Sequence, residues 1–156
     1  MIKKLVLITL VIQLMGFVSG CTSTTSKNDP ADIAAINSMS AARAKAFNEG
    51  NADGIAIHFT EDGVLMAPGS PSTSGRAAVR AYYQSLFDQY ATELESGYED
   101  VHVSGDLAYG RGFAKVMLVP HGGGDTLVST AKYINILERQ ADGLWLTTHD
   151  IWNGNE

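Results

Sequence analysis

Hydrophobic and polar positions follow two different periods along this 156-residue chain. In residues 31–48 and 76–90, apolar side chains recur every three or four positions, which is typical of amphipathic helices. Residues 52–59 show the same spacing over a shorter length. The first part of the chain is therefore expected to supply three helices, with a short strand at 64–67 between the second and the third.

After position 90 the pattern changes to strands separated by turns. Turn signals rich in Gly and Asp lie at 104–106, 121–125 and 141–143. The strands expected between them cover residues 93–104, 107–119, 126–139 and 144–153. Successive hairpins make an antiparallel meander. Helices followed by strands predict an α+β fold, with the three helices packed on one face of a curved antiparallel sheet.

The N-terminal 20 residues have the pattern of an export signal. Lys3 and Lys4 precede an apolar run at 5–17, which is shorter than the ~20 residues of a membrane span and fits the hydrophobic region of a signal peptide. The following Val18-Ser19-Gly20-Cys21 resembles the bacterial lipobox. That resemblance implies cleavage before Cys21 and lipidation of this residue, and acyl chains hold a protein at a membrane. The alternative is an ordinary signal peptide followed by an incidental cysteine.

The lipobox resemblance also implies a location in the cell envelope. Residues 22–30 are polar without periodicity and predict a flexible tether, so the expected division is 1–20 signal peptide, 21–30 tether and 31–156 folded domain. In many Gram-negative bacteria an aspartate after the lipidated cysteine retains the protein at the inner membrane. Thr22 stands there instead, and the resemblance favours the outer membrane, facing the periplasm.

Composition excludes several classes of function. Without Lys3 and Lys4, the 11 basic residues fall to nine against 17 acidic ones, a formal charge of −8. Such an acidic surface argues against a nucleic-acid partner. Cys21 is the single cysteine, so no intramolecular disulfide can form. The four histidines have no metal-ligand spacing, and no nucleotide-binding fingerprint is present. We therefore expect no metal and no cofactor.

Several short motifs, in this order, resemble one known family. They are Phe59–Pro68 (FTEDGVLMAP), Gly75-Arg76, Ser104–Gly112 (SGDLAYGRG), Ala131-Lys132-Tyr133, Asp142–Trp145 (DGLW) and Asp150–Asn153 (DIWN). Together they resemble the SnoaL-like and ketosteroid-isomerase-like branch of the nuclear-transport-factor-2-like superfamily, with SgcJ/EcaC-type proteins as the nearest relatives. The resemblance covers about residues 32–153. It implies a cone-shaped α+β fold, a mostly apolar pocket that opens at one end, and in many members a homodimer formed through the sheet.

The chemistry of ketosteroid isomerases does not carry over. Those enzymes use a carboxylate base and an oxyanion site made by a tyrosine and a protonated aspartate. The matching positions here are Ala67 for the base, Arg43 for the tyrosine and Lys132 for the aspartate. A supporting tyrosine is matched by Tyr83. The resemblance therefore implies the pocket without the isomerase residues.

A different polar cluster is expected in its place. By period two, Lys132 shares a strand face with Ile134 and Ile136, and Asp150 shares one with Thr148 and Trp152. If both faces are concave, one cavity is lined by these candidates: Lys132, Asp150, Trp152, Tyr83, Met66 and Arg43. In one interpretation Arg43 and Lys132 hold an anionic or carbonyl-bearing ligand, and Asp150 orients it or accepts a proton. In the other, Lys132 and Asp150 are a buried structural ion pair.

The other candidates also have two interpretations. Arg43 is either a solvated helix flank or a ligand contact, and Tyr83 and Trp152 serve either packing or recognition. His58 is expected in the core, and His149 on the opposite side of the sheet from Asp150.

Three functions fit these features. The first is a lipid-anchored protein that binds a small, partly apolar or anionic molecule. The second is a cofactor-independent isomerase, cyclase or dehydratase with Asp150 as base and Lys132 as its electrostatic partner. The third is an assembly protein acting through the outer face of its sheet. Binding ranks first, because the known catalytic residues are missing.

Overall fold

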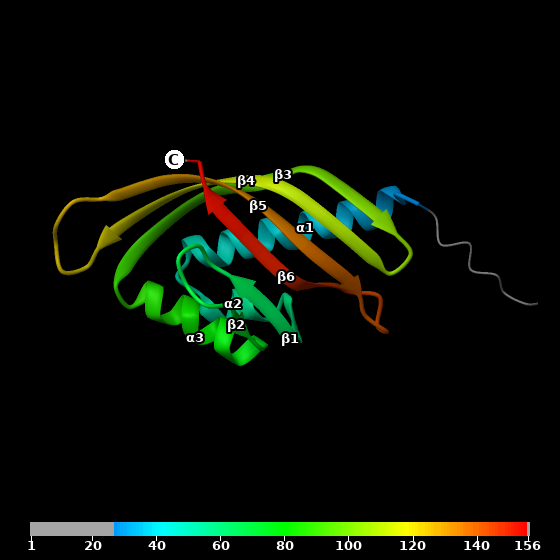
Figure 1. The fold of residues 1–156 in the computed structure, drawn as a ribbon, viewed down its shortest axis with the longest axis horizontal. Helices are drawn as coiled ribbons and strands as arrows, with labels where there is room; N and C mark the ends of the chain where they lie inside the picture. Colours follow the sequence, from blue (N-terminus) through cyan, green and yellow to red (C-terminus); the bar gives the residue numbers. More distant parts are fainter. Residues whose placement is uncertain (1–26, 156) are drawn as a thin grey trace, which may run out of the picture.

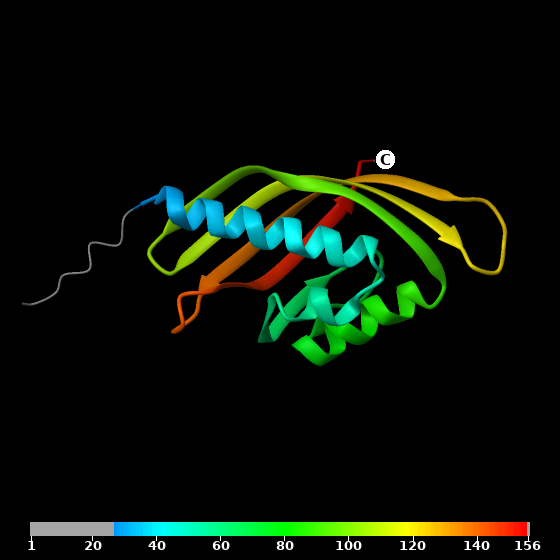
Figure 2. The same ribbon diagram turned by 180° about the vertical axis from the view of Figure 1, so that it is seen from behind.

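The computed structural model describes residues 27–155, and their helices lie against the concave side of a curved sheet (Figures 1 and 2). The signal-peptide prediction for residues 1–20 and the lipidation prediction for Cys21 lie outside the described residues. None of the helices described is long and apolar enough to cross a membrane.

The longest helix, α1 (Pro30–Asn48), begins at a strong start signal. The Asp29 side chain accepts a hydrogen bond from the Ala31 N–H at 2.8 Å, and a proline in the first turn has no N–H to lose. The predicted helix over 31–48 is thus confirmed.

Two shorter helices cover the other part of the concave face. They are α2 (Ala52–Ala56) and α3 (Arg76–Phe87). Both end about three residues before their predicted ends, because Phe59 and Tyr90 already begin strands. Ile55 and Phe59 are buried as expected, but they belong to different elements.

Six strands form one sheet in the order β2-β1-β6-β5-β4-β3. Their bounds are β1 (Phe59–Met66), β2 (Thr73–Ser74), β3 (Tyr90–Ser104), β4 (Leu107–Pro120), β5 (Leu127–Arg139) and β6 (Trp145–Gly154). The antiparallel meander β3 to β6 confirms the hairpin prediction. The expected early strand is longer than predicted and pairs in parallel with β6. The two-residue strand β2 was not predicted.

Apolar side chains gather in two separate clusters. One packs α2, α3 and β1 together around Ile55, Phe59 and Val79. The other packs the first turns of α1 onto the far end of the sheet, around Ile36 and Leu137. Because α1 contributes to both clusters, it spans the region between them (Figure 2).

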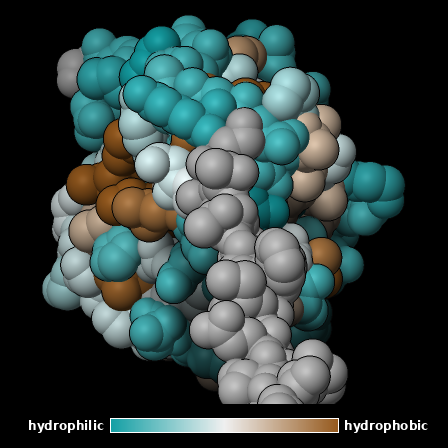
Figure 3. All heavy atoms as spheres, turned by 90° about the vertical axis from the view of Figure 1, so that its right-hand side faces the viewer, coloured by the Kyte–Doolittle hydropathy of each residue, from teal (hydrophilic) through white to brown (hydrophobic). Residues whose placement is uncertain are grey.

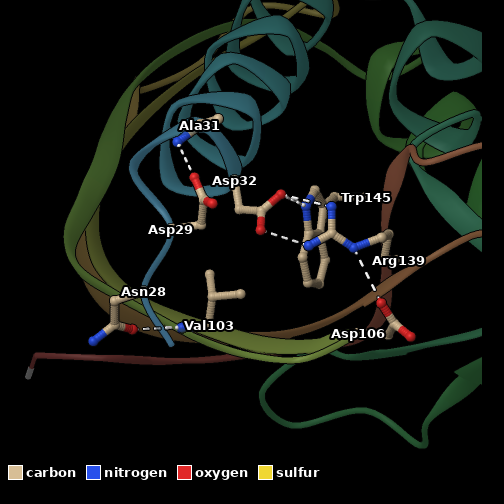
Figure 4. Close-up of polar contacts among 8 residues, drawn as sticks. All are labelled: Asn28, Asp29, Ala31, Asp32, Val103, Asp106, Arg139 and Trp145. Carbon is tan, nitrogen blue, oxygen red and sulfur yellow. Dashed lines mark hydrogen bonds and ion pairs between the residues drawn. The ribbon is translucent and has the colours of Figure 1, made fainter. Parts of the chain in front are cut away.

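A polar cluster, which we call the N-terminal clamp, ties the start of α1 to the sheet (Figure 4). Arg139 donates to both carboxylate oxygens of Asp32, at 2.6 and 2.5 Å, and to Asp106 at 3.1 Å. The Trp145 indole N–H donates to Asp32 at 3.2 Å, and its ring lies under the Arg139 guanidinium at 4.6 Å. Asn28 is hydrogen-bonded to the backbone of β3. The chain therefore enters the domain through a fixed point.

Candidate ligand pocket

A cavity of about 390 Å³ lies between α1, α3 and the concave face of β3 to β6. Its walls are mostly apolar and include Phe47, Leu86, Leu94, Val116, Leu118 and Trp152. Volume and lining are typical of sites for small organic molecules, which span about 300–1,000 Å³. Its charged and amide side chains come from α1, β5 and β6 and are Arg43, Asn135 and Asp150.

The centre of this polar region is an ion pair between Arg43 of α1 and Asp150 of β6. Arg43 Nη2 donates to Asp150 Oδ2 at 2.5 Å, and Nη1 donates to Thr147 Oγ1 at 3.3 Å. The two side chains are only 13% and 8% exposed. The guanidinium also lies 4.7 Å from the centre of the Phe59 ring, a favourable cation–π distance. Arg43 is therefore a buried member of the site and not a solvated helix flank.

Burial and nearby charges shift the pKa values of several side chains in this region. Burial by itself would lower the pKa of Arg43, but the charge and hydrogen bond of Asp150, together with the nearby Tyr83 and Tyr98, outweigh burial and keep that pKa above its ordinary value. Burial raises the pKa of the Tyr83 and Tyr98 phenols, with Asp150 adding to the shift. Burial, then the positive charge of Arg43, lowers the pKa of His58. At neutral pH the pocket thus holds one balanced ion pair and neutral phenols.

Asn135 of β5 is the second polar residue of the pocket floor. It is 2% exposed and faces Asp150 directly across the β5–β6 pair. Its Oδ1 accepts a hydrogen bond from the Tyr98 hydroxyl at 2.7 Å, whereas its Nδ2 has no acceptor among the described residues. A buried amide N–H without an acceptor is costly, so this atom marks a place where a ligand oxygen would be stabilised.

Two glycines of β4 explain how the aromatic side chains fit on the concave face. A Cβ added at Gly110 would lie 2.4 Å from the Tyr98 ring, and one at Gly112 would lie 2.6 Å from the Tyr133 ring. Glycine at 110 therefore leaves room for the Tyr98 ring, which crosses β4 to reach Asn135, and glycine at 112 leaves room for the Tyr133 ring and for the Gly97 carbonyl. The alternating Gly110-x-Gly112 pattern in the sequence is a signal for this crossing, and both tyrosines lie beside the pocket residue Asn135.

Four predicted site residues are brought together at the pocket. Arg43, Tyr83, Asp150 and Trp152 all line it, and Tyr83 is 8% exposed. His149 lies exposed on the outer side of the sheet, as expected from its alternation with Asp150. His58 is half-buried, not fully in the core.

Lys132 does not lie in the pocket, so the expectation that it lines one cavity with Asp150 is wrong, and the two residues do not form an ion pair. Lys132 is exposed, and its Nζ reaches the Gly154 carbonyl at 3.4 Å and the Asn155 side chain at 3.3 Å. The buried face of β5 carries Ala131 and Asn135 instead. The partner of Asp150 is the helix residue Arg43.

Met66 is also misplaced by the sequence prediction. Its neighbour Leu65 is fully buried and lies opposite Asp150 on β6. Because side chains alternate along a strand, Met66 points to the other side, and it is not among the residues that line the cavity. Pro68 lines it two positions later.

The misplacement on β5 has a physical cause. Ile134 and Ile136 suggested that the strand face they share with Lys132 points inward, because apolar side chains usually point to the core. Here they are 39% and 38% exposed on the outer side, while the inner side carries Tyr133 and Asn135 toward the pocket. On β6, Thr147 lies inside and a bulge follows it, so Thr148 leaves the face of Asp150.

Metal ligands are sparse in the part of the chain that the structure describes. Among residues 27–155, no group of three or more His, Asp or Glu side chains is placed to hold a metal ion. The donors of the pocket are a carboxylate paired with an arginine, an amide and phenols.

Comparisons with known proteins give a family and a shared fold. A family model described as a SnoaL-like domain matches residues 41–147. A ketosteroid isomerase-like protein from Erwinia carotovora atroseptica SCRI1043 has a similar structure, with a TM-score of 0.73, 24% identity, and coverage of 80% of this chain and 97% of that one. No curated protein matches the chain.

Two further solved structures share the fold. A conserved protein from Planctomyces limnophilus DSM 3776 has a TM-score of 0.75 at 20% identity and covers 81% of this chain and 99% of its own. An NTF2-like protein with a cystatin-like fold from Novosphingobium aromaticivorans DSM has a TM-score of 0.69 at 20% identity, covering 81% and 84%. These likenesses confirm the predicted α+β fold.

Proposed function

The chain belongs to the SnoaL-like family, and on that premise we propose that it binds a small, mostly apolar molecule in the cavity beside the Arg43–Asp150 pair. The observation that carries this proposal is the cavity of about 390 Å³ with apolar walls and a polar floor. An apolar ligand would gain from leaving water, and the polar groups would fix its orientation.

Retention of a molecule by the purified protein tests this proposal. Extracts of the full chain produced in bacteria are compared by mass spectrometry with extracts of Ala114→Leu. Ala114 lines the cavity opposite Ala131 on the next strand, so the larger side chain takes up ligand volume. The parent protein is expected to retain a small molecule that the variant lacks. Identical extracts, together with no thermal stabilisation by any apolar compound, would contradict the proposal.

Lipid anchoring at Cys21 is the second part of the proposal. The lipobox-like Val18–Cys21 and the polar stretch after it support a protein held at the outer membrane, facing the periplasm. Radiolabelled palmitate is expected to enter the parent protein but not Cys21→Ser, and the parent should fractionate with outer membranes. A parent protein that takes up no label and stays in the soluble fraction would contradict the anchor.

A homodimer is proposed through what we call the outer sheet patch: Tyr109, Phe113, Ile134, Ile136 and Ile151. These side chains lie on one face of β4 to β6 and are each 38% to 42% exposed. Hydrophobic surface also gathers on one flank of the molecule in Figure 3. Around a two-fold axis, the same patch on two copies of the chain meets itself, and its apolar side chains become buried in the dimer.

Sedimentation velocity tests the dimer. The parent is expected to sediment as a dimer and Ile134→Glu as a monomer, since the new carboxylate would meet its own copy or its neighbours in the interface. A parent that is monomeric at all concentrations would contradict the proposal. If crosslinking in cells instead traps a different protein on this patch, the alternative assembly function is favoured.

Proton transfer is the second candidate function, favoured by one observation. Asp150 uses Oδ2 for Arg43, while its Oδ1 accepts no hydrogen bond from the described residues. A carboxylate oxygen beside an apolar cavity could take a proton from a carbon next to a carbonyl. Exchange of the α-hydrogens of 1-tetralone in D2O, followed by NMR, is then faster with the parent than with Asp150→Asn. Equal rates for both would remove this candidate.

A further inference from the structure

The polar floor of the pocket combines one unused donor with one unused acceptor. Asn135 and Asp150 are directly opposite each other on β5 and β6, and side chains in such pairs start about 4.5–5.5 Å apart. Asn135 Nδ2 has no acceptor, and Asp150 Oδ1 has no donor, among residues 27–155. Both residues are more than nine-tenths buried.

Neighbouring residues hold these two side chains in place. The Tyr98 hydroxyl binds Asn135 Oδ1 at 2.7 Å, which orients the amide with Nδ2 away from Tyr98. Arg43 binds Asp150 Oδ2 at 2.5 Å, which fixes the carboxylate from the side of α1. A ligand would therefore meet a preorganised donor and acceptor and would not have to order them.

The charge of the pocket is balanced before any ligand enters. Arg43 and Asp150 are the only charged side chains that line it among the described residues, and they neutralise each other. Burial raises the pKa of Tyr83 and Tyr98, so their phenols stay protonated at neutral pH. A charged ligand would bring one uncompensated charge into a space of low polarity, which is costly.

We propose that Asn135 and Asp150 together recognise an uncharged ligand that carries a hydroxyl group next to a carbonyl or ether oxygen on an otherwise apolar skeleton. The ligand oxygen accepts from Asn135 Nδ2, and the ligand hydroxyl donates to Asp150 Oδ1. This inference rests on the proposed binding function and narrows it, because it removes the anionic ligands that the sequence left open.

A series of compounds with one bicyclic skeleton tests the inference. The probes are tetralin, 1-tetralone, 2-hydroxy-1-tetralone, 1-aminotetralin and tetralin-1-carboxylate, each titrated into the full chain by isothermal calorimetry. The hydroxyketone is expected to bind about 100-fold more tightly than tetralin, since each of two good hydrogen bonds contributes about tenfold. The ketone is expected between them, and the ammonium and carboxylate compounds below tetralin.

Two variants separate recognition from general packing. Asn135→Leu has a similar volume and removes the amide donor, so the hydroxyketone should lose about tenfold in affinity while tetralin changes little. Lys132→Gln lies on the same strand but on the outer side, and should leave all five affinities unchanged. If Asn135→Leu unfolds, Asn135→Ser, which keeps a hydroxyl near Tyr98, replaces it with the same expectation.

The outcomes distinguish this inference from the proposed function. Tight binding of the carboxylate, or a hydroxyketone affinity that Asn135→Leu and Asn135→Ser leave unchanged, would overturn the inference while the binding function stands. Failure of every compound, tetralin included, would overturn the binding function and the inference with it.

Discussion

Two arginine–aspartate pairs join α1 to the sheet, and they differ in how completely their hydrogen-bonding groups are used. In the N-terminal clamp, the carboxylate of Asp32 lies on the helix and Arg139 lies on the sheet. At the pocket the order is reversed, with Arg43 on the helix and Asp150 on the sheet. Both pairs have an N–O distance of 2.5 Å.

In the N-terminal clamp, the hydrogen-bonding groups of the ion pair all have partners. All three guanidinium nitrogens of Arg139 donate to carboxylates, and both oxygens of Asp32 accept. Asp32 also lies in the first turn of α1, where the helix dipole favours a negative charge. Nothing is left for a ligand, so the clamp is a structural element.

In the Arg43–Asp150 pair, some hydrogen-bonding atoms have no partner among the described residues. Arg43 Nε has no partner among the described residues, and Asp150 accepts through one oxygen only. It also lies beside a cavity, whereas the clamp packs against the closed cluster of Ile36 and Leu137. Burial and a short contact therefore do not make a site. Unused donors and acceptors next to open volume do.

The largest loss of stability is expected when one partner of the Arg43–Asp150 pair is removed. Asp150→Leu leaves the Arg43 guanidinium buried without a counter-charge, which should lower the free energy of unfolding by about 3–5 kcal/mol. Urea denaturation measures this loss. The double variant Arg43→Met/Asp150→Leu removes both charges and should recover most of the stability. A double variant as unstable as the single one would show that the ion pair is not the reason.

The clamp should cost less to break. Arg139→Met removes hydrogen bonds to Asp32 and Asp106, but Arg139 is 29% exposed and water can replace part of what is lost. We expect a loss of about 1–3 kcal/mol in urea denaturation, with the affinity for 2-hydroxy-1-tetralone unchanged. A large drop in that affinity would mean that the two regions are not independent.

A smaller effect concerns the pH dependence of stability. His58 has a folded-state pKa below its ordinary 6.5, first because of burial and second because of Arg43. The unfolded chain therefore takes up the proton first as the pH falls through about 6.5, and stability is lost toward acid. His58→Gln should lose less stability than the parent between pH 7.5 and 5.5. Parallel stability curves would contradict this.

The smallest effect is expected at Lys132. Because its side chain is exposed on the outer face, Lys132→Gln should change the free energy of unfolding by less than about 0.5 kcal/mol. A loss of several kcal/mol would contradict the exposed position of the Lys132 side chain.

Local patterns in the sequence were sufficient for most of the fold. The helix of residues 30–48 and the Gly-rich turns depend on neighbours in the chain. The parallel pairing of β1 with β6 depends on contacts that the sequence does not express locally.

The site was harder to predict, because some apolar side chains of the pocket strands face outward and some polar ones face inward. On β5 the apolar Ile134 and Ile136 face outward and Asn135 faces inward, and the bulge on β6 shifts Thr147 relative to Asp150. Asp150 and Trp152 were correctly placed on one inner face, since no bulge separates them. The pairing of Arg43 with Asp150 joins residues 107 positions apart, which no spacing rule reveals.

The two tryptophans of the chain report on the two regions separately. Trp152 lines the cavity, and Trp145 belongs to the N-terminal clamp. In a ¹H–¹⁵N NMR titration with 2-hydroxy-1-tetralone, the indole signal of Trp152 is predicted to shift until it saturates while that of Trp145 stays in place. A saturating shift at Trp145 alone, or no shift at either indole, would contradict the account that the cavity beside Arg43 and Asp150 is the binding site.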